Sequence, residues 1–178
     1  MTVPMRRARP EDGVSLRDIE RLAGERFRDV GLDDVADDEP PSLEVLAAYA
    51  DGARSWVAVD GADSPIGYVL VDIVDGCAHV EQVSVLPDRQ GVGVGRALLE
   101  QVRRWAADSG LAAVTLTTFT DVPWNAPLYR HIGFRALSET EIGPELSTLR
   151  EREEAHGLDP AQRVCMRADV SHPLVGGL

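Results

Sequence analysis

The chain has 178 residues, 44% of them hydrophobic and 27% charged, which suits a single soluble domain with an ordinary core. Its 30 acidic residues outnumber the 18 basic ones, and the net charge of −12 argues against non-specific binding to nucleic-acid phosphates. Every basic residue is an arginine, which excludes chemistry that needs a lysine amine. We see neither a signal peptide nor an apolar run near the roughly 20 residues of a membrane helix, so we expect a cytoplasmic protein without a membrane partner.

The two cysteines, Cys77 and Cys165, stand far apart in apolar runs, and we expect two buried free thiols. The four histidines are scattered and form no cluster with metal-ligand spacing. We therefore expect no metal.

The first half of the chain predicts a strand over residues 3–9 and then a helix capped by Ser15. That helix should bury an apolar face made of Leu16, Ile19, Leu22, Ala23 and Phe27. Residues 29–44 contain seven acids and no base, so we expect most of this acidic segment to be a solvated loop. Ser42 should cap a second helix that ends at Asp51-Gly52.

Three strands should follow, over residues 56–59, 66–74 and 78–86. The dipeptides Asp60-Gly61 and Asp75-Gly76 separate them, and Asp-Gly between apolar runs is a strong signal for a hairpin. An antiparallel meander is expected.

The second half predicts a helix over 93–109, a buried strand over 113–119, a short helix over 124–132, a strand over 134–137, a helix over 144–157 and a strand over 163–170. This order indicates an α/β fold with a mixed, twisted sheet of six to seven strands and helices on both faces. Residues 1–170 should form one domain, and residues 171–178 a frayed tail.

The richest segment runs from Val83 to Leu99, where a strand leads into a glycine-rich turn that opens a helix. Glycines let backbone N–H groups approach a ligand, and a helix N-terminus attracts anions, so the turn has the character of an anion cradle flanked by Arg89 and Arg96. The dinucleotide pattern fails because Arg96 takes the place of its third glycine, and the phosphate-loop pattern fails for lack of a lysine. The alternative is a glycine-rich turn that binds nothing.

The motif Gln90-x-x-Gly93-x-Gly95 resembles the acetyl-CoA pyrophosphate signature of the GNAT family of N-acetyltransferases. The resemblance extends to Arg7-Ala8-Arg9-Pro10-Glu11-Asp12, which is similar to the family's opening strand and turn. It also includes Leu128-Tyr129-Arg130-His131-Ile132-Gly133-Phe134-Arg135, which resembles its tyrosine-bearing helix and following strand. The element order agrees from about residue 3 to residue 170, so a GNAT-like acyl-CoA N-acyltransferase fold is expected.

The resemblance implies acetyl-CoA as co-substrate. Its diphosphate would accept hydrogen bonds from the backbone N–H groups of Gly91 through Arg96, which also include those of Val92, Gly93, Val94 and Gly95. Its pantetheine arm would lie along Val83, Ser84 and Val85, and the N–H of Val83 would polarise the thioester carbonyl. Many members carry an asparagine seven residues before the tyrosine, where this chain has Val122; Asn125 is the substitute candidate for contact with the cofactor arm.

Acetyl transfer to an amine needs the neutral amine, which for an alkylamine at pH 7 costs roughly 4–5 kcal/mol. Glu81 and then His79 are the candidates for the base or for positioning a water, because residues 79, 81 and 83 share one face of a regular strand. A bulge would break that parity, and the alternative for Glu81 is a solvated or ion-paired acid. Tyr129 is the candidate acid for the leaving thiolate; the alternative is a packing role.

The expected function is thus acetyl transfer from acetyl-CoA to a primary amine of a small molecule or peptide, directly in a ternary complex. The acidic segment would attract a cationic acceptor such as a polyamine, an aminoglycoside-like amine or a basic peptide end, but a merely solvated loop is the preferred explanation of its acids. The competing hypothesis is a non-catalytic module that binds or senses acyl-CoA. The resemblance leaves a homodimer open, and it leaves the acceptor and acyl-chain length undefined.

Overall fold

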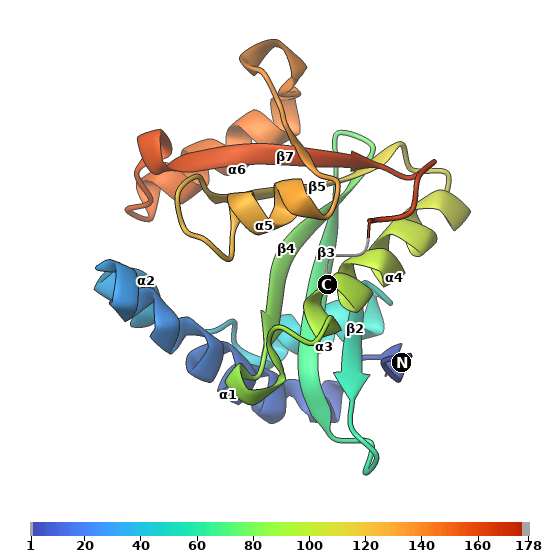
Figure 1. The fold of residues 1–178 in the computed structure, drawn as a ribbon. Helices are drawn as coiled ribbons and strands as arrows, with labels where there is room; N and C mark the ends of the chain where they lie inside the picture. Colours follow the sequence, from blue (N-terminus) through green and yellow to red (C-terminus); the bar gives the residue numbers. More distant parts are fainter. Residues whose placement is uncertain (1, 176–178) are drawn as a thin grey trace. The chain divides into compact units, whose positions relative to one another are not determined.

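The computed structural model describes residues 2–175. Its seven strands form a mixed sheet in the order β1-β2-β3-β4-β5-β7-β6 (Figure 1). The chain divides into two compact units, with Met1–Val71 and Glu81–Leu99 in unit 1, and Asp72–Val80 and Glu100–Leu178 in unit 2. Three elements supply residues to both units, namely β3 (Pro65–Val74), β4 (Cys77–Val85) and α4 (Val94–Asp108).

Unit 1 begins with β1 (Met5–Arg7), a 3-10 turn η1 (Pro10–Asp12), and helix α1 (Gly13–Gly24). It continues through the 3-10 segment η2 (Glu25–Val30), the short helix α2 (Asp33–Ala36), helix α3 (Leu43–Asp51) and β2 (Ser55–Val59). Strand β2 is antiparallel to both β1 and β3. The cap predicted for α3 is confirmed: Ser42 Oγ accepts the N–H of Val45 at 3.2 Å, and Gly52 ends the helix.

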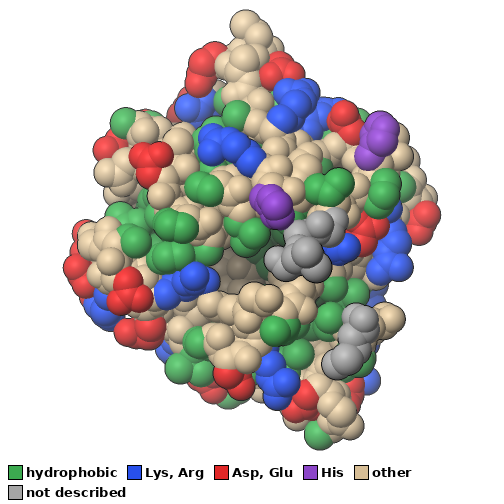
Figure 2. Space-filling model, in the orientation of Figure 1, with side chains coloured by type: hydrophobic (Ala, Val, Ile, Leu, Met, Phe, Trp, Pro, Cys, Tyr) green, Lys and Arg blue, Asp and Glu red, His purple; other side chains and the backbone are tan. Residues whose placement is uncertain are grey.

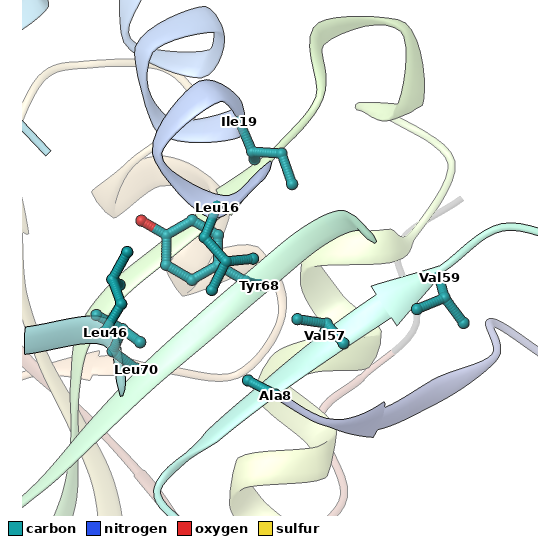
Figure 3. Packing of buried hydrophobic residues seen from close by; sticks show 8 residues of the cluster. All are labelled: Ala8, Leu16, Ile19, Leu46, Val57, Val59, Tyr68 and Leu70. Atoms are coloured by element: carbon teal, nitrogen blue, oxygen red, sulfur yellow. The ribbon is translucent and has the colours of Figure 1, made fainter. Parts of the chain in front are cut away.

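The core of unit 1 forms where α1 and α3 cover one face of the strands (Figure 3). Leu16 and Ile19, one turn apart on α1, are 2% exposed, and they pack with Leu46 of α3 and with Val57 and Tyr68 of the sheet. The prediction was wrong for Leu22, whose side chain is 51% exposed. It was also wrong for the start of the helix, which lies at Gly13 rather than after Ser15.

Unit 2 contains the parts of β3 and β4 that flank the turn Asp75-Gly76, in which both residues have positive φ (48° and 71°), as this hairpin type requires. It then comprises β5 (Ala113–Phe119), α5 (Ala126–His131), β6 (Arg135–Ala136), the 3-10 turn η4 (Glu139–Glu141), α6 (Pro144–Ala155), the 3-10 turn η5 (Pro160–Gln162) and β7 (Arg163–Asp169). Within this unit β4 is parallel to β5, and β7 is antiparallel to both β5 and β6.

Helices α5 and α6 lie on opposite sides of the β5–β7 pair, with α5 in front of β5 and α6 behind β7 (Figure 1). Side chains join α6 to the strands: Glu153 accepts hydrogen bonds from Thr117 of β5 and Arg163 of β7. The carboxylate of Asp75 accepts the N–H groups of Glu145 and Leu146, at 3.1 and 2.9 Å, and so caps the start of α6. Strand β5 is buried along most of its length, as predicted.

The segment after β7 differs from the free tail expected from the sequence. The side chain of Leu174 is buried, and its N–H donates to Glu100 Oε2 at 3.1 Å. The N–H of Val175 donates to the carbonyl of Ile132 at 3.1 Å. Gly176, Gly177 and Leu178 lie outside the described residues.

Candidate active site

The glycine-rich turn of unit 1 links β4 to α4 through the 3-10 turn η3 (Pro87–Arg89). Gly91 and Gly93 have φ of 74° and 91°, conformations that residues with a Cβ rarely adopt. A Cβ at either position would meet no atom within 4 Å, so the turn is open above both glycines. Glycine therefore suits both positions because of the backbone conformation. The absence of side chains at Gly91 and Gly93 also leaves the peptide groups of the turn accessible.

Helix α4 starts at this turn. The N–H of Ala97 donates to the carbonyl of Gly93 at 3.0 Å, which closes the first helical turn. Val94, Gly95 and Arg96 form the first turn of α4, where the backbone N–H groups point toward the N-terminal end of the helix. Together with the positive end of the helix dipole they form a site suited to an anion.

The end of β4 and the start of α4 are held together at Gly67 of β3. A Cβ at Gly67 would lie 3.1 Å from the carbonyl oxygen of Ser84, 3.2 Å from Cγ2 of Val85 and 3.3 Å from Cγ1 of Val94. A side chain at this position would press on the backbone of β4 and on the buried side chains of Val85 and Val94, which glycine allows to pack closely over this strand. Both ends of the turn are anchored by packing.

The two arginines predicted to flank the turn, Arg89 and Arg96, and the turn residue Val92 also lie in unit 1. Arg89 is half exposed, with its Nε 3.6 Å from the carboxylate of Asp88, and Arg96 is half-buried in the first turn of α4. Val92, between the two glycines, is 71% exposed. The side chain of Gln90 points back to the strand, where its Nε2 donates to the carbonyl of Val85 at 2.9 Å.

Along the unit-1 part of β4, Glu81 is exposed, Val83 is half-buried and Ser84 is buried. Ser84 Oγ accepts a hydrogen bond from Gln82 Nε2 at 2.8 Å. It also bonds to the hydroxyl of Tyr68, which in turn donates to the carboxylate of Glu20 on α1. Burial raises the pKa of Glu20, and the hydrogen bond from Tyr68 partly opposes that rise.

His79 lies on the unit-2 part of β4 and is 1% exposed. Its Nδ1 shares a hydrogen bond of 3.0 Å with Oγ1 of Thr115 on β5. Burial lowers the pKa of His79 to about 4, so its imidazole is neutral at physiological pH.

Tyr129 and Asn125 lie in unit 2 at helix α5. Asn125 is the N-cap residue, and its carbonyl accepts the N–H of Tyr129 at 2.9 Å. The ring of Tyr129 meets that of Phe134 edge-on, with centroids 5.7 Å apart. Burial raises the pKa of Tyr129 to about 12, against a weaker opposing effect of Arg163, so the hydroxyl keeps its proton.

The sequence of this chain is similar to those of known acetyltransferases. Residues 16–134 match the sequence model of the family described as acetyltransferase (GNAT) family. The chain belongs to the GNAT family. An N-acetyltransferase named YjcF from Bacillus subtilis is 28% identical over 108 residues, which cover 61% of this chain and 74% of that protein. YjaB of Escherichia coli, a peptidyl-lysine N-acetyltransferase, is 27% identical over 143 residues, or 80% of this chain and 88% of that protein.

Solved structures share the GNAT fold. The PaiA N-acetyltransferase of Thermoplasma acidophilum, in complex with coenzyme A, superposes with a TM-score of 0.68 over 95% of this chain and 99% of its own, at 14% identity. A GNAT acetyltransferase of Brucella melitensis, in complex with acetyl-CoA, gives 0.55 over 80% and 90%, at 25% identity. The resemblance, the mixed seven-stranded sheet and the class of enzyme, an acyl-CoA-dependent N-acetyltransferase, are thereby confirmed.

The acidic segment of this GNAT protein is largely exposed to solvent, as we expected, but it is not a loop throughout. Its residues 33–36 form helix α2, and arginines neutralise several of its acids. Arg28 contacts Asp37 at 2.5 Å and Asp33 at 3.5 Å, and Arg17 and Arg21 both reach Glu39, at 3.1 and 3.2 Å. Figure 2 shows acidic (red) and basic (blue) side chains interspersed over the visible face of the protein. The expectation overlooked these pairs because the arginines precede the segment, with Arg17 and Arg21 on α1 and Arg28 in η2.

The sequence reasoning missed the polar pair formed by Glu20 and Tyr68. A signal existed, because Glu20 follows Leu16 by four residues and thus lies beside the apolar stripe of its helix. Within residues 2–175, no group of three or more His, Cys, Asp or Glu side chains is arranged to hold a metal. No helix in that range is both long and apolar enough to cross a membrane.

Proposed function

We propose that the protein transfers the acetyl group of acetyl-CoA directly to a primary amine, in a ternary complex without a covalent enzyme intermediate. The open turn at Gly91 and Gly93 carries this proposal, because its backbone N–H groups and the first turn of α4 suit the diphosphate of coenzyme A. Arg89 and Arg96 add positive charge beside that turn. CoA or acetyl-CoA in the structures of the PaiA and Brucella acetyltransferases supports the same choice of co-substrate.

We assign the strand residues Val83, Ser84 and Val85 to the pantetheine arm. The N–H of Val83 would donate to the thioester oxygen as negative charge develops there. Asn125 is assigned to the cofactor arm as well. It begins α5 with a half-buried side chain.

Glu81 is the preferred base. Its carboxylate is exposed and can receive the amine proton directly or through a water. His79 is the second candidate; its neutral imidazole could accept a proton, but the ring is enclosed and bonded to Thr115. In the transfer, the amine nitrogen bonds to the carbonyl carbon, the carbon–sulfur bond breaks, and the sulfur leaves with the bonding electrons.

Tyr129 is assigned as the acid that gives its proton to the leaving sulfur, and solvent later restores that proton. A phenol with a pKa of about 12 is fully protonated at neutral pH, as this role requires. The phenol is an intrinsically weak acid, so the transfer depends on the sulfur carrying negative charge when it leaves.

The acceptor is proposed to be the amine of a cationic small molecule or of a peptide. Similarity to YjaB, a peptidyl-lysine N-acetyltransferase, supports including a lysine side chain among the candidates. The paired acids of the acidic segment weaken the case for a purely polycationic acceptor. A cytoplasmic location and a homodimer stay predictions.

The test is a radiolabelled acetyl-CoA assay over polyamines, aminoglycosides and lysine peptides, beside calorimetry with CoA. We expect CoA binding and amine-dependent label transfer. Binding without transfer to any amine would favour the non-catalytic acyl-CoA-binding module, and absence of CoA binding would remove both functions.

A further inference from the structure

Gln90 opens the glycine-rich turn, and both ends of its side-chain amide are engaged. Nε2 donates to the carbonyl of Val85 at 2.9 Å, and Oε1 accepts from Nη1 of Arg26 at 2.7 Å. Rotating the amide by 180° would place two donors against each other and two acceptors against each other. The two partners therefore fix the orientation of Gln90.

Arg26 comes from η2, 64 residues earlier in the sequence. It is half-buried, and burial lowers the pKa of its guanidinium, although an arginine stays charged in a folded protein. A hydrogen bond from a charged donor is stronger and shorter than one between neutral groups. Arg26 is thus a firm support for the amide of Gln90.

The other end of this connection is equally fixed. The side chain of Val85 is buried against Val94 over Gly67, so the carbonyl that Gln90 reaches does not move freely. Between these supports stand Gly91 and Gly93, which have little conformational preference of their own. A turn made of such residues presents its N–H groups to an anion only if something else holds it in shape, and preorganisation of that kind increases affinity.

We propose that Arg26 is a positioning residue for the diphosphate-binding turn, and that it acts through Gln90 rather than on the ligand. This inference rests on the proposed function, since it needs CoA to bind at the turn. It also makes η2, the segment that leads into the acidic stretch, part of the apparatus that holds the cofactor.

The experiment measures CoA affinity by calorimetry for the wild type, Arg26→Ala, Gln90→Ala and the double variant. We expect each single variant to bind CoA about tenfold more weakly, and the double variant to bind no more weakly than Gln90→Ala alone. Arg28→Ala is the matched control, because Arg28 lies on the same segment and bonds to Glu25 and Asp37 instead of the turn. It should bind CoA as the wild type does.

Arg26→Lys serves as the conservative variant if Arg26→Ala does not fold, and it should recover part of the affinity because it keeps a charged donor. Steady-state kinetics should show a raised KM for acetyl-CoA with nearly unchanged kcat. The inference is overturned if Arg26→Ala and Arg26→Lys bind CoA as tightly as the wild type, or if the two alanine effects add in full, since Arg26 would then act independently of Gln90. Failure of the wild type to bind CoA would instead remove the proposed function.

Discussion

The imidazole of His79 hydrogen-bonds to the hydroxyl of Thr115 at 3.0 Å, where β4 and β5 pair in parallel. The pairing aligns these two residues directly, and the histidine is almost fully enclosed. A proton added to this ring would place a charge in a site with little water. His79 therefore stays neutral in the folded protein, and its hydrogen bond to Thr115 is made by the neutral imidazole.

The first prediction concerns stability against pH. The pKa of His79 is about 4 in the folded chain and near 6.5 when exposed, so between these values the unfolded chain binds a proton that the folded chain does not. This contribution to stability is complete above pH 6.5 and is lost as the pH falls toward 4. It amounts to about 2 kcal/mol between pH 7.5 and pH 5. Urea unfolding of the wild type and of His79→Gln at both pH values measures it.

His79→Gln should lose less stability than the wild type over this interval, whatever its stability at pH 7.5. His172→Gln is the control, because it makes the same substitution at an exposed histidine. Equal pH slopes for the wild type and His79→Gln would show that His79 is protonated in the folded chain.

The second prediction tests the glycine turn. Gly93→Glu should weaken CoA binding by at least about tenfold, because glutamate resists a φ of 91° and brings a negative charge to an anion site. Gly110→Glu is the matched control: Gly110 also has positive φ (72°) and open space around its Cβ position, but it ends α4 rather than beginning it. Calorimetry measures the affinity of both folded variants for CoA. Wild-type affinity in Gly93→Glu would place the diphosphate elsewhere.

Local sequence signals predicted several features of the fold well. The dipeptide Asp75-Gly76 has two positive φ angles, Ser42 caps α3 by its side chain, and Gly110 ends α4 in a left-handed conformation. Each depends on residues that are neighbours in the chain. The glycine-rich turn at Gly91 and Gly93 was also predictable from local sequence, because the spacing of the glycines and the helix that follows can both be read there.

Features that depend on distant side chains could not be predicted in this way. The helix at Asp33–Ala36 forms within an acid-rich stretch where Arg28 contacts Asp33 and Asp37. The bond from Arg26 to Gln90 joins positions 64 residues apart, and no local pattern marks it. Leu22 fits the helical spacing of the apolar face of α1, yet it is exposed. The elements that pack on a helix determine how wide its buried face is, and the helix's own sequence does not show this.

The third prediction concerns the base. Glu81→Gln removes the proton acceptor with little change in shape and should lower kcat by at least about 100-fold, with CoA affinity nearly unchanged. Glu151→Gln, the same substitution at an exposed carboxylate on α6, should have no effect on turnover. Steady-state kinetics with the amine found in the panel, and CoA calorimetry, provide both readouts. Full activity of Glu81→Gln would show that Glu81 is not the base, and His79 or a water would then be the candidate.

The fourth prediction isolates the hydroxyl of Tyr129. Phenylalanine at this position keeps the edge-on contact with Phe134, so Tyr129→Phe removes the acid while preserving the packing. We expect kcat to fall by at least about 100-fold and the affinity for CoA to change less than about threefold. Phe134→Leu is the companion variant, because it disturbs the same aromatic pair and leaves the hydroxyl in place. It should lower the melting temperature while retaining more turnover than Tyr129→Phe. Wild-type kcat in Tyr129→Phe would limit Tyr129 to packing and leave water to protonate the sulfur.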